Sequence, residues 1–251
     1  MNPAEFEHIA RSEDQMWWFV GMRKILEAWL TRLPGQRFDR VLEAGCGTGY
    51  MSGWLSRRYG WRMFPVDLSF KGLCFARDMG LKRLAQADIA CLPYGDRQFD
   101  AVVSLDVLAH LDRGGEAAAL KEFLRVLRPG GKLIVRTSAL DSLRSRHTEF
   151  AHERQRFTAR RLRQAVESAG FQVLELSYAN SLLLPVAWFK FRVWEALTTL
   201  TPQSGVEVPG AILNRLLQIP LGLEALWLRW GGRFPLGQSL LVIAEKSTKA
   251  P

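Results

Sequence analysis

The strongest constraint on the fold is the alternation of short apolar segments with amphipathic helical segments between residues 39 and 140. The apolar segments have the length of strands, and helical patterns that end in glycine or proline separate most of them. In the second of these helices, Ser69 is the expected N-cap and Gly80 the expected stop. The predicted strands cover residues 39–45, 61–67, 81–88, 99–105 and 132–140. Strands that alternate with helices build a parallel sheet covered on both faces. The chain is therefore predicted to be a doubly wound α/β protein.

The remaining segments complete this prediction. A helix and a sixth strand are expected within residues 157–179, and residues 237–246 read as a final strand, which gives a mostly parallel seven-stranded sheet. Residues 181–232 are rich in Leu, Trp and Phe without strand alternation, so we expect a helical insertion before the last strand. Helical spacing of apolar residues also predicts an N-terminal helical segment within residues 1–35. All of these belong to one expected domain, residues 1–251.

Composition says more about the compartment and the partners of the protein than about its activity. The formal net charge of +9 suits an anionic substrate, an acidic membrane surface or nucleic acid, and it also occurs in proteins with no such partner. The three cysteines lack metal-ligand spacing and make a poor disulfide framework, so a reducing, cytoplasmic compartment is expected. The N-terminus is polar and does not resemble a secretory signal, and no uncharged apolar run is long enough to predict a spanning helix.

The carboxyl ends of the predicted strands hold the residues with the clearest chemistry. The first strand runs into VLEAGCGTGY, in which Gly45, Gly47 and Gly49 alternate. Asp67 and Asp88 end the next two predicted strands. Because parallel strands end at one edge of the sheet, these positions are expected to line one crevice. A dinucleotide fingerprint does not fit, because Tyr50 stands where its third glycine is required.

The alternating glycines, with Glu43 two residues before them, resemble the first motif of class I S-adenosylmethionine-dependent methyltransferases, in a type 11-like branch. The resemblance covers most of the chain and implies a Rossmann-like methyltransferase fold. It also implies S-adenosylmethionine as cofactor and S-adenosylhomocysteine as product. LRVLRPGGKLIV is similar to the helix, turn and fifth strand of that family.

The same resemblance assigns roles to individual residues. Asp67 would grip the two ribose hydroxyls, Asp88 would lie near the adenine amino group, and Glu43 would steady the glycine loop and the cofactor's amino group. WWFVGMRK is similar to a segment that forms a helix over the cofactor mouth in one branch, so that Trp18 would cover the ligand and Arg23 would meet its carboxylate. Alternatively, both tryptophans of this segment are core residues. The cofactor contacts expected from the resemblance are Trp18, Arg23, Glu43, Gly45, Cys46, Gly47, Gly49, Asp67, Leu68, Asp88, Ile89 and Leu105.

Methyl transfer from a sulfonium depends mainly on holding the nucleophile close and in line, and a base is needed only when the acceptor must lose a proton. Three histidines are candidates: His110 follows the fourth strand, and His147 and His152 follow the fifth. Each has an ordinary structural alternative, such as anchoring a loop. No metal site is predicted.

Two segments allow more than one interpretation. The arginine-rich stretch between residues 144 and 163 is either an anion clamp for the acceptor or, as we favour, a solvated face paired with local acids. For residues 181–232, burial as a cap over the acceptor site is the first expectation. Peripheral membrane contact and a homodimer interface are the alternatives.

The function expected from these residues is methyl transfer to a small, hydrophobic or aromatic acceptor, with O-methylation ahead of N- or C-methylation. A second interpretation is a cofactor-binding partner protein without catalysis. An RNA methyltransferase is the third, and it is disfavoured because the chain shows neither a nucleic-acid recognition motif nor an Asn-Pro-Pro-aromatic element.

Overall fold

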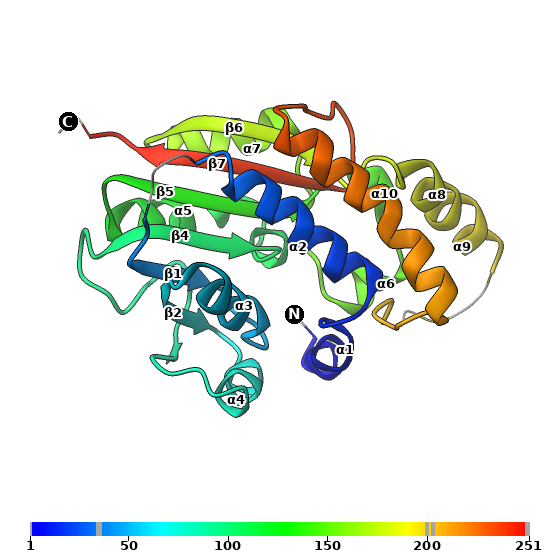
Figure 1. The fold of residues 1–251 in the computed structure, drawn as a ribbon, viewed down its shortest axis with the longest axis horizontal. Coiled ribbons are helices and arrows are strands. Elements are labelled where there is room, and N and C mark those ends of the chain that lie inside the picture. The colour runs from blue at the N-terminus through cyan, green and yellow to red at the C-terminus, as the bar shows by residue number, and fades with distance from the viewer. Residues whose placement is uncertain (1, 34–36, 199–200, 202–203, 249–251) are drawn as a thin grey trace. The chain divides into compact units, whose positions relative to one another are not determined.

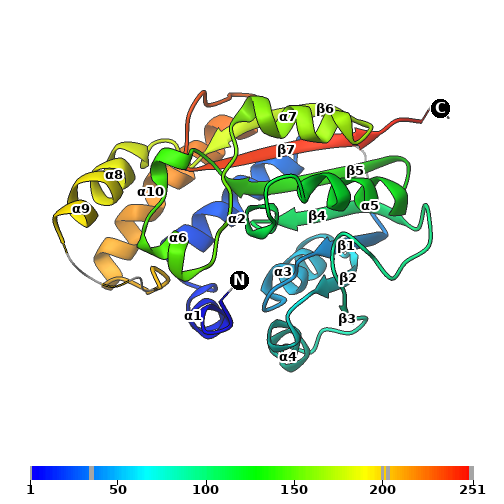
Figure 2. The same ribbon diagram turned by 180° about the vertical axis from the view of Figure 1, so that it is seen from behind.

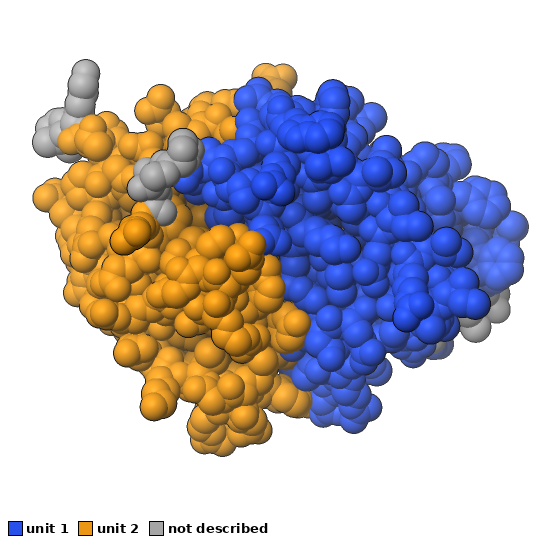
Figure 3. Space-filling model, viewed as in Figure 1, with its two compact units in different colours: residues 1–36, 139–153, 177–240 blue, residues 37–138, 154–176, 241–251 orange. Residues whose placement is uncertain are grey.

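The computed structural model describes residues 2–33, 37–198, 201 and 204–248. The chain divides into two compact units, coloured separately in Figure 3. Met1–Gln36, Ala139–Glu153 and Ser177–Leu240 form the helical unit; Arg37–Ser138, Arg154–Leu176 and Leu241–Pro251 form the sheet unit. These six segments alternate along the chain, so the chain passes between the units five times.

The sheet unit is built on a seven-stranded sheet in the order β3-β2-β1-β4-β5-β7-β6. β1 pairs in parallel with β2 and β4, and the pairs β2–β3 and β4–β5 are also parallel. The arrow of β7 points opposite to that of β4 in Figure 1, so the sheet is mixed. The predicted Rossmann-like α/β sheet is thus confirmed. Its strands are β1 (Arg40–Ala44), β2 (Arg62–Asp67), β3 (Ala85–Gln86), β4 (Phe99–Leu105), β5 (Leu127–Ser138), β6 (Phe171–Ala179) and β7 (Ser239–Lys246).

The helices of the sheet unit begin and end where local chemistry predicts. They are α3 (Tyr50–Tyr59), α4 (Phe70–Asp78), α5 (Glu116–Val126) and α7 (Ala159–Ser168). The Ser69 hydroxyl caps α4 by accepting from the Gly72 N–H at 3.2 Å, as the sequence predicted. Gly60 ends α3 with a φ of 71°, a left-handed conformation that suits glycine.

Two strands differ most from their predicted extents. The third strand was expected over residues 81–88 but is limited to Ala85–Gln86, because Arg83 has a φ of 62° and interrupts the extended backbone. The fifth strand was expected from residue 132 but begins at Leu127. Phe99 faces Leu127 whereas Ala101 faces Lys132, so the proline-glycine turn of this segment is a bulge within β5 rather than a loop before it.

The central strands supply the core of the sheet unit. Most side chains of β1 and β4, and those of the second half of β5, are buried, including Val41, Leu42, Val102, Val103 and Leu133. Continuous burial along neighbouring strands is typical of a sheet covered on both faces. The carboxyl ends of β1 and β4 are consequently held rigidly side by side.

The helical unit is organised around the pairing of α2 (Trp17–Leu30) with α10 (Ala211–Arg229), which lie side by side in Figures 1 and 2. Gly21 permits this close approach, since a Cβ at that position would lie 2.1 Å from Leu221 Cδ1. Asn214 accepts from the Trp17 N–H at 2.7 Å and donates to the Gln15 carbonyl at 2.9 Å. The unit also contains α1 (Glu5–Ser12), which the sequence did not predict as a separate helix, α6 (Arg146–Phe150), α8 (Leu184–Phe189), a π-helical turn η3 (Lys190–Trp194) and α9 (Glu195–Leu197).

The insertion of residues 181–232 is helical, as predicted, but the expectation that it is buried is wrong for most of its large apolar side chains. Leu197 is 77% exposed, Ile212 is 79% exposed and Trp230 is 75% exposed. Helical spacing predicts that a residue lies on a face of a helix, and it does not tell which faces find a partner. Within the part of the chain that the structure describes, no helix is both long and apolar enough to cross a membrane.

Candidate functional site

The glycine loop between β1 and α3 has a backbone that other residues adopt poorly. Gly45, Gly47 and Gly49 have φ values of 87°, 54° and 81°. The N–H groups of Gly45 and Cys46 both donate to the Val66 carbonyl, at 2.9 and 2.8 Å. The end of β2 therefore holds the loop in this conformation.

The loop lies at the point where the strand order reverses. β1 has β2 on one side and β4 on the other, and the chain reaches them in opposite directions from β1. The Ser104 hydroxyl of β4 donates to the Ala44 carbonyl at 3.0 Å, which ties the two strand ends together. A Cβ on Gly45 would lie 2.2 Å from Val107 Cγ2, so the segment after β4 also packs directly on the loop. The ends of β1, β2 and β4 thus meet at the glycine loop, where the sequence predicts a ligand crevice.

Asp67 links the glycine loop to the segment after β2. Its Oδ2 accepts from the Gly47 N–H at 2.7 Å, and its Oδ1 accepts from the Ser69 N–H at 2.8 Å. Burial raises the pKa of the Asp67 carboxyl, and these two backbone hydrogen bonds oppose that shift. A carboxylate has about four lone-pair sites, so Asp67 keeps acceptor capacity for a ligand. The link to Gly47 was not predicted from the sequence.

Glu43 and Cys46 are buried around the base of the loop. Glu43 is 2% exposed and accepts a hydrogen bond from the Ser52 hydroxyl, so it joins β1 to the first turns of α3. Burial raises the pKa of the Cys46 thiol, and the neighbouring carboxylates of Glu43 and Asp67 raise it further. Cys46 is therefore a packed thiol at neutral pH and not a nucleophile.

The other predicted cofactor contacts of the sheet unit surround the same strand ends with mixed exposure. Asp88 is exposed, and its Oδ1 accepts from the Ala90 N–H at 2.9 Å. Ile89 is buried, Leu105 is half-buried, and Leu68 is 67% exposed. These strand ends combine a glycine backbone without side chains, two carboxylates and an exposed apolar side chain. Such a combination suits a ligand that carries hydroxyl or amino groups and an apolar face.

An ion pair that the sequence did not reveal lies at the same edge. Asp106 has a φ of 61°, unusual for a residue other than glycine, and its Oδ2 accepts from Arg136 Nε at 3.0 Å and from Arg136 Nη2 at 2.5 Å. The Arg136 side chain is 7% exposed. A sequence signal exists, because an arginine interrupts the apolar run of β5. Its partner follows only from the pairing of β4 with β5.

His110 lies in a short 3-10 turn, η1 (Leu108–His110), directly after β4. Its N–H donates to the Val107 carbonyl at 2.9 Å, and its side chain is half-buried. Gln155 donates from Nε2 to the Leu108 carbonyl at 3.1 Å, which fastens the turn to the segment before α7. His110 is thus in the same unit as the glycine loop.

The remaining predicted site residues belong to the helical unit. Trp18 packs edge-on against Phe19, with 5.0 Å between ring centroids. The Arg23 guanidinium donates to the carbonyls of Glu13 and Asp14, the latter at 2.9 Å. The Nδ1 of His147 accepts from the Gly205 N–H at 3.1 Å and lies 3.7 Å from Glu5 Oε1. His152 has a φ of 56° at the end of the segment that carries α6. The predicted residues therefore fall into two sets, one in each unit.

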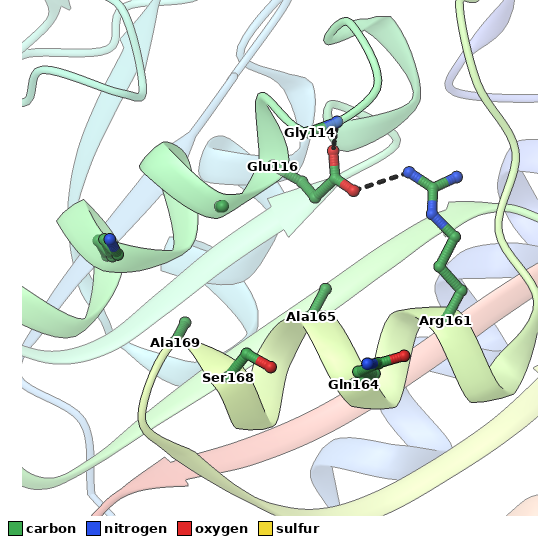
Figure 4. Close-up of a pocket in the computed structure, with 9 residues that line it drawn as sticks. Gly114, Glu116, Arg161, Gln164, Ala165, Ser168 and Ala169 are labelled. Atoms are coloured by element: carbon green, nitrogen blue, oxygen red, sulfur yellow. Dashed lines mark hydrogen bonds and ion pairs between the residues drawn. The ribbon is translucent and has the colours of Figure 1, made fainter.

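The arginine-rich stretch pairs largely with nearby acids. The Arg161 guanidinium lies 2.7 Å from Glu116 Oε1, and the two groups point toward each other in a groove between α5 and α7 (Figure 4). Lys121, Gln164 and small residues such as Ala165 line the rest of this groove, which is not at the glycine loop. Further ion pairs of the stretch join Arg144 to Asp141, Arg154 to Asp112, and Arg163 to Glu167. These ion pairs support the interpretation that the arginines form a solvated face paired with local acids. They argue against an anion clamp for the acceptor.

Comparison with known proteins relates this geometry to one family. The methyltransferase domain family matches residues 42–135. A malonyl-[acyl-carrier protein] O-methyltransferase of Enterobacter lignolyticus is 40% identical over 122 residues, which are 48% of this chain and 47% of that protein. The match thus spans about half the length of that relative. The Salmonella typhimurium protein of the same description is 30% identical over 221 residues, 86% of this chain and 85% of the relative.

Solved structures agree on the fold. A chain from the complex between the Haloferax volcanii Trm112 methyltransferase activator and a methyltransferase superimposes with a TM-score of 0.63. It is 21% identical, and the superposition covers 99% of this chain and 96% of that chain. At this identity the likeness concerns the fold alone.

Proposed function

Because the chain belongs to the class I S-adenosylmethionine-dependent methyltransferases, we propose that it transfers a methyl group to an oxygen of a small, hydrophobic or aromatic acceptor. The observation that carries the proposal is the glycine loop at the reversal of strand order, held by Val66 and by Asp67. The two malonyl-[acyl-carrier protein] O-methyltransferases support oxygen as the acceptor atom.

The residues of the sheet unit fit S-adenosylmethionine. Gly47 keeps the backbone free of a side chain in a left-handed conformation, and Asp67 retains lone pairs suited to the two ribose hydroxyls. Asp88 is exposed and suited to an amino group, and Leu68 and Ile89 offer apolar contact. When bound, the cofactor supplies a methyl group on a positively charged sulfur whose leaving form is a neutral thioether.

The contribution of the protein to the reaction is mainly positioning. An acceptor carboxyl is already ionised at neutral pH and needs no base, whereas an alcohol or a phenol has to lose a proton. For such an acceptor His110 is the first candidate base, because it follows β4 in the same unit as the glycine loop. His147 and His152 are the alternative candidates. We further propose that residues 181–232, where large apolar side chains are exposed, govern the choice of acceptor.

Binding and turnover test the proposal in sequence. Calorimetric titration with S-adenosylmethionine and S-adenosylhomocysteine should show saturable binding of both. Release of S-adenosylhomocysteine should then follow the addition of phenols, alcohols or acyl carboxylates to the loaded enzyme. Binding without release for any acceptor would favour the non-catalytic partner protein, and absence of binding would overturn the proposal.

A substitution at Asp67 locates the binding site. Asp67→Ala should weaken cofactor binding by about thirtyfold or more, because unpaired hydroxyls in a closed site cost on the order of 2 kcal/mol. Asp78→Ala removes an exposed carboxylate at the end of α4 and is the matched control, with affinity unchanged. Equal affinity in the two folded variants would exclude Asp67 from the site.

A further inference from the structure

One face of α10 is apolar and open to solvent. Ile212, Leu216, Ile219, Leu223, Leu226 and Trp230 are each 43–79% exposed. They are separated by alternating steps of four and three residues, so they form one continuous stripe along the helix and past its end. We call these six residues the α10 stripe.

The α10 stripe is not the face that folds the helix into its unit. Asn214, Leu221, Ala225 and Leu228 are buried on the opposite side, and α10 packs along α2. The helix therefore carries two apolar faces, and among the residues that the structure describes one face is buried and the other is exposed. A continuous exposed apolar face of this length usually marks an interaction surface.

A second exposed apolar segment belongs to the same unit. Trp188, Phe189 and Trp194, from α8 and η3, are 51–59% exposed. In both ribbon views α8 and α9 lie at the side of the unit that α10 also occupies (Figures 1 and 2). Exposed tryptophans beside aliphatic side chains are typical of segments that meet the boundary between lipid and water.

The exposed charges around these segments are mostly positive. Arg215 and Arg229 on α10 and Lys190 and Arg192 on η3 are all exposed. The single acid in the sequence of α10, Glu224, is fully buried and accepts from the N–H groups of Ser181 and Leu182, both at 2.7 Å. Glu195 is half-buried and accepts from the Arg146 N–H at 2.9 Å, and the exposed acid Glu207 lies in the connection before α10. The helical surface itself is thus apolar and basic.

These charges distinguish between two occupants. A second copy of the chain would bring Arg215 and Arg229 against the same arginines, with no exposed acid on α10 to pair with them. An anionic lipid surface instead offers phosphates to the arginines and hydrocarbon to the stripe. Because no described helix is long and apolar enough to span a bilayer, the helix would lie in the surface.

We propose that the helical unit binds the surface of anionic membranes, with the α10 stripe and the tryptophans of α8 and η3 inserted at the level of the headgroups. The proposal goes beyond methyl transfer, since it concerns where the enzyme acts. It stands whether or not the acceptor atom is oxygen. It also provides a partner for apolar side chains that would otherwise remain in water.

Vesicle flotation with the full chain tests the proposal. The protein should float with vesicles made of equal parts of phosphatidylcholine and phosphatidylglycerol, and much less with phosphatidylcholine alone. Leu216→Gln with Leu223→Gln leaves the charge unchanged and should weaken binding by about tenfold for each leucine removed. Arg215→Gln with Arg229→Gln should weaken it by about fivefold per arginine and reduce its sensitivity to salt.

The controls separate this surface from the fold and from methyl transfer. Leu174→Gln, at a partly exposed leucine of β6, makes the same chemical change elsewhere and should leave flotation unaffected. All variants should bind S-adenosylmethionine like the parent. Flotation is measured independently of methyl transfer, so a failure of the proposed function would leave the flotation result unchanged. The proposal is overturned if the parent does not float with anionic vesicles. It is also overturned if the leucine variant floats like the parent. The same holds if that variant keeps flotation but loses self-association in solution or binding to an acidic carrier protein.

Discussion

Gly45 meets two independent constraints, on its backbone and on the space around it. Its φ of 87° is unfavourable for any side chain, and a Cβ would lie 2.2 Å from Val107 Cγ2. Gly45→Ala should lower the free energy of unfolding by about 2–5 kcal/mol, the sum of about 1–2 for the backbone and about 1–3 for overpacking. Gly60→Ala is the matched control, since Gly60 has a φ of 71° with no atom within 4 Å of the added Cβ.

Urea unfolding of three variants separates the backbone contribution from the steric contribution to the loss of stability. Gly60→Ala should cost about 1–2 kcal/mol, the backbone term alone. Adding Val107→Ala to Gly45→Ala should recover much of the steric part of the loss. Equal costs for Gly45→Ala and Gly60→Ala would contradict the close contact between the loop and the segment after β4.

Glu224 should make stability depend on pH. Burial raises the pKa of its carboxyl, against the opposing hydrogen bonds from Leu182 and Ser181. The folded protein then binds this proton more tightly than the unfolded chain does, so the contribution of Glu224 favours folding below its ordinary value of 4.5 and is lost as pH rises through the folded pKa. Glu224→Gln should remove this contribution, which thermal unfolding of both proteins over that pH range measures. The same pH dependence in both proteins would assign it to other groups.

Single residues were predictable where the chemistry is local. Ser69 was predicted as the cap of α4, and the structure confirms it, because capping depends on residues three positions apart. The bond from Gly47 to Asp67 and the pairing of Asp106 with Arg136 join residues from different strands. Such contacts depend on strand order and register, which no local pattern contains.

At the scale of elements, the pairing of α2 with α10 depends on one small residue. Alanine is the better helix former by about 1 kcal/mol, so Gly21→Ala would stabilise an isolated helix. Here the new Cβ would lie 2.1 Å from Leu221 Cδ1 and 2.6 Å from Leu221 Cβ. Gly21→Ala should therefore destabilise the protein. Overpacking should cost about 1–3 kcal/mol, and the gain in helix propensity of about 1 kcal/mol offsets part of that cost.

A second substitution identifies the cause. Leu221→Ala alone should cost about 2–5 kcal/mol as a large-to-small change in a buried site. The double variant should lose less free energy of unfolding than the two single variants lose together. Calorimetric unfolding of all four proteins measures this difference. Additive costs would mean that Gly21 and Leu221 do not meet.

Elements were predicted best where a strand is central. The strand over residues 99–105 has the predicted limits, because its neighbours bury it on both sides. The edge strand β3 is far shorter than predicted, and α1 was not predicted as a separate helix, because its eight residues make only about two helical turns. Periodicity identified the helices of residues 181–232 and not which of their faces stays exposed.

At the scale of the whole molecule, the last strand in sequence lies inside the sheet. β7 separates β5 from β6. A chain that stops after Gly237 lacks β7 and leaves the facing edges of β5 and β6 unpaired, so it should aggregate on expression. A chain that stops after Thr248 keeps β7 and tests for the effect of shortening as such. Recovery in the soluble fraction measures both, and a soluble, cofactor-binding product from the shorter chain would contradict the strand order.

The division into two units concerns inheritance as well as folding. Since each unit is assembled from three separated segments, one crossover between two related genes cannot transfer either unit whole; five breakpoints would be required. Two breakpoints suffice, however, to replace Ser177–Leu240, the segment that carries both the α10 stripe and the exposed tryptophans. Recombination can therefore exchange the α10 stripe and the exposed tryptophans while leaving the glycine loop and strands β1, β2 and β4 unchanged.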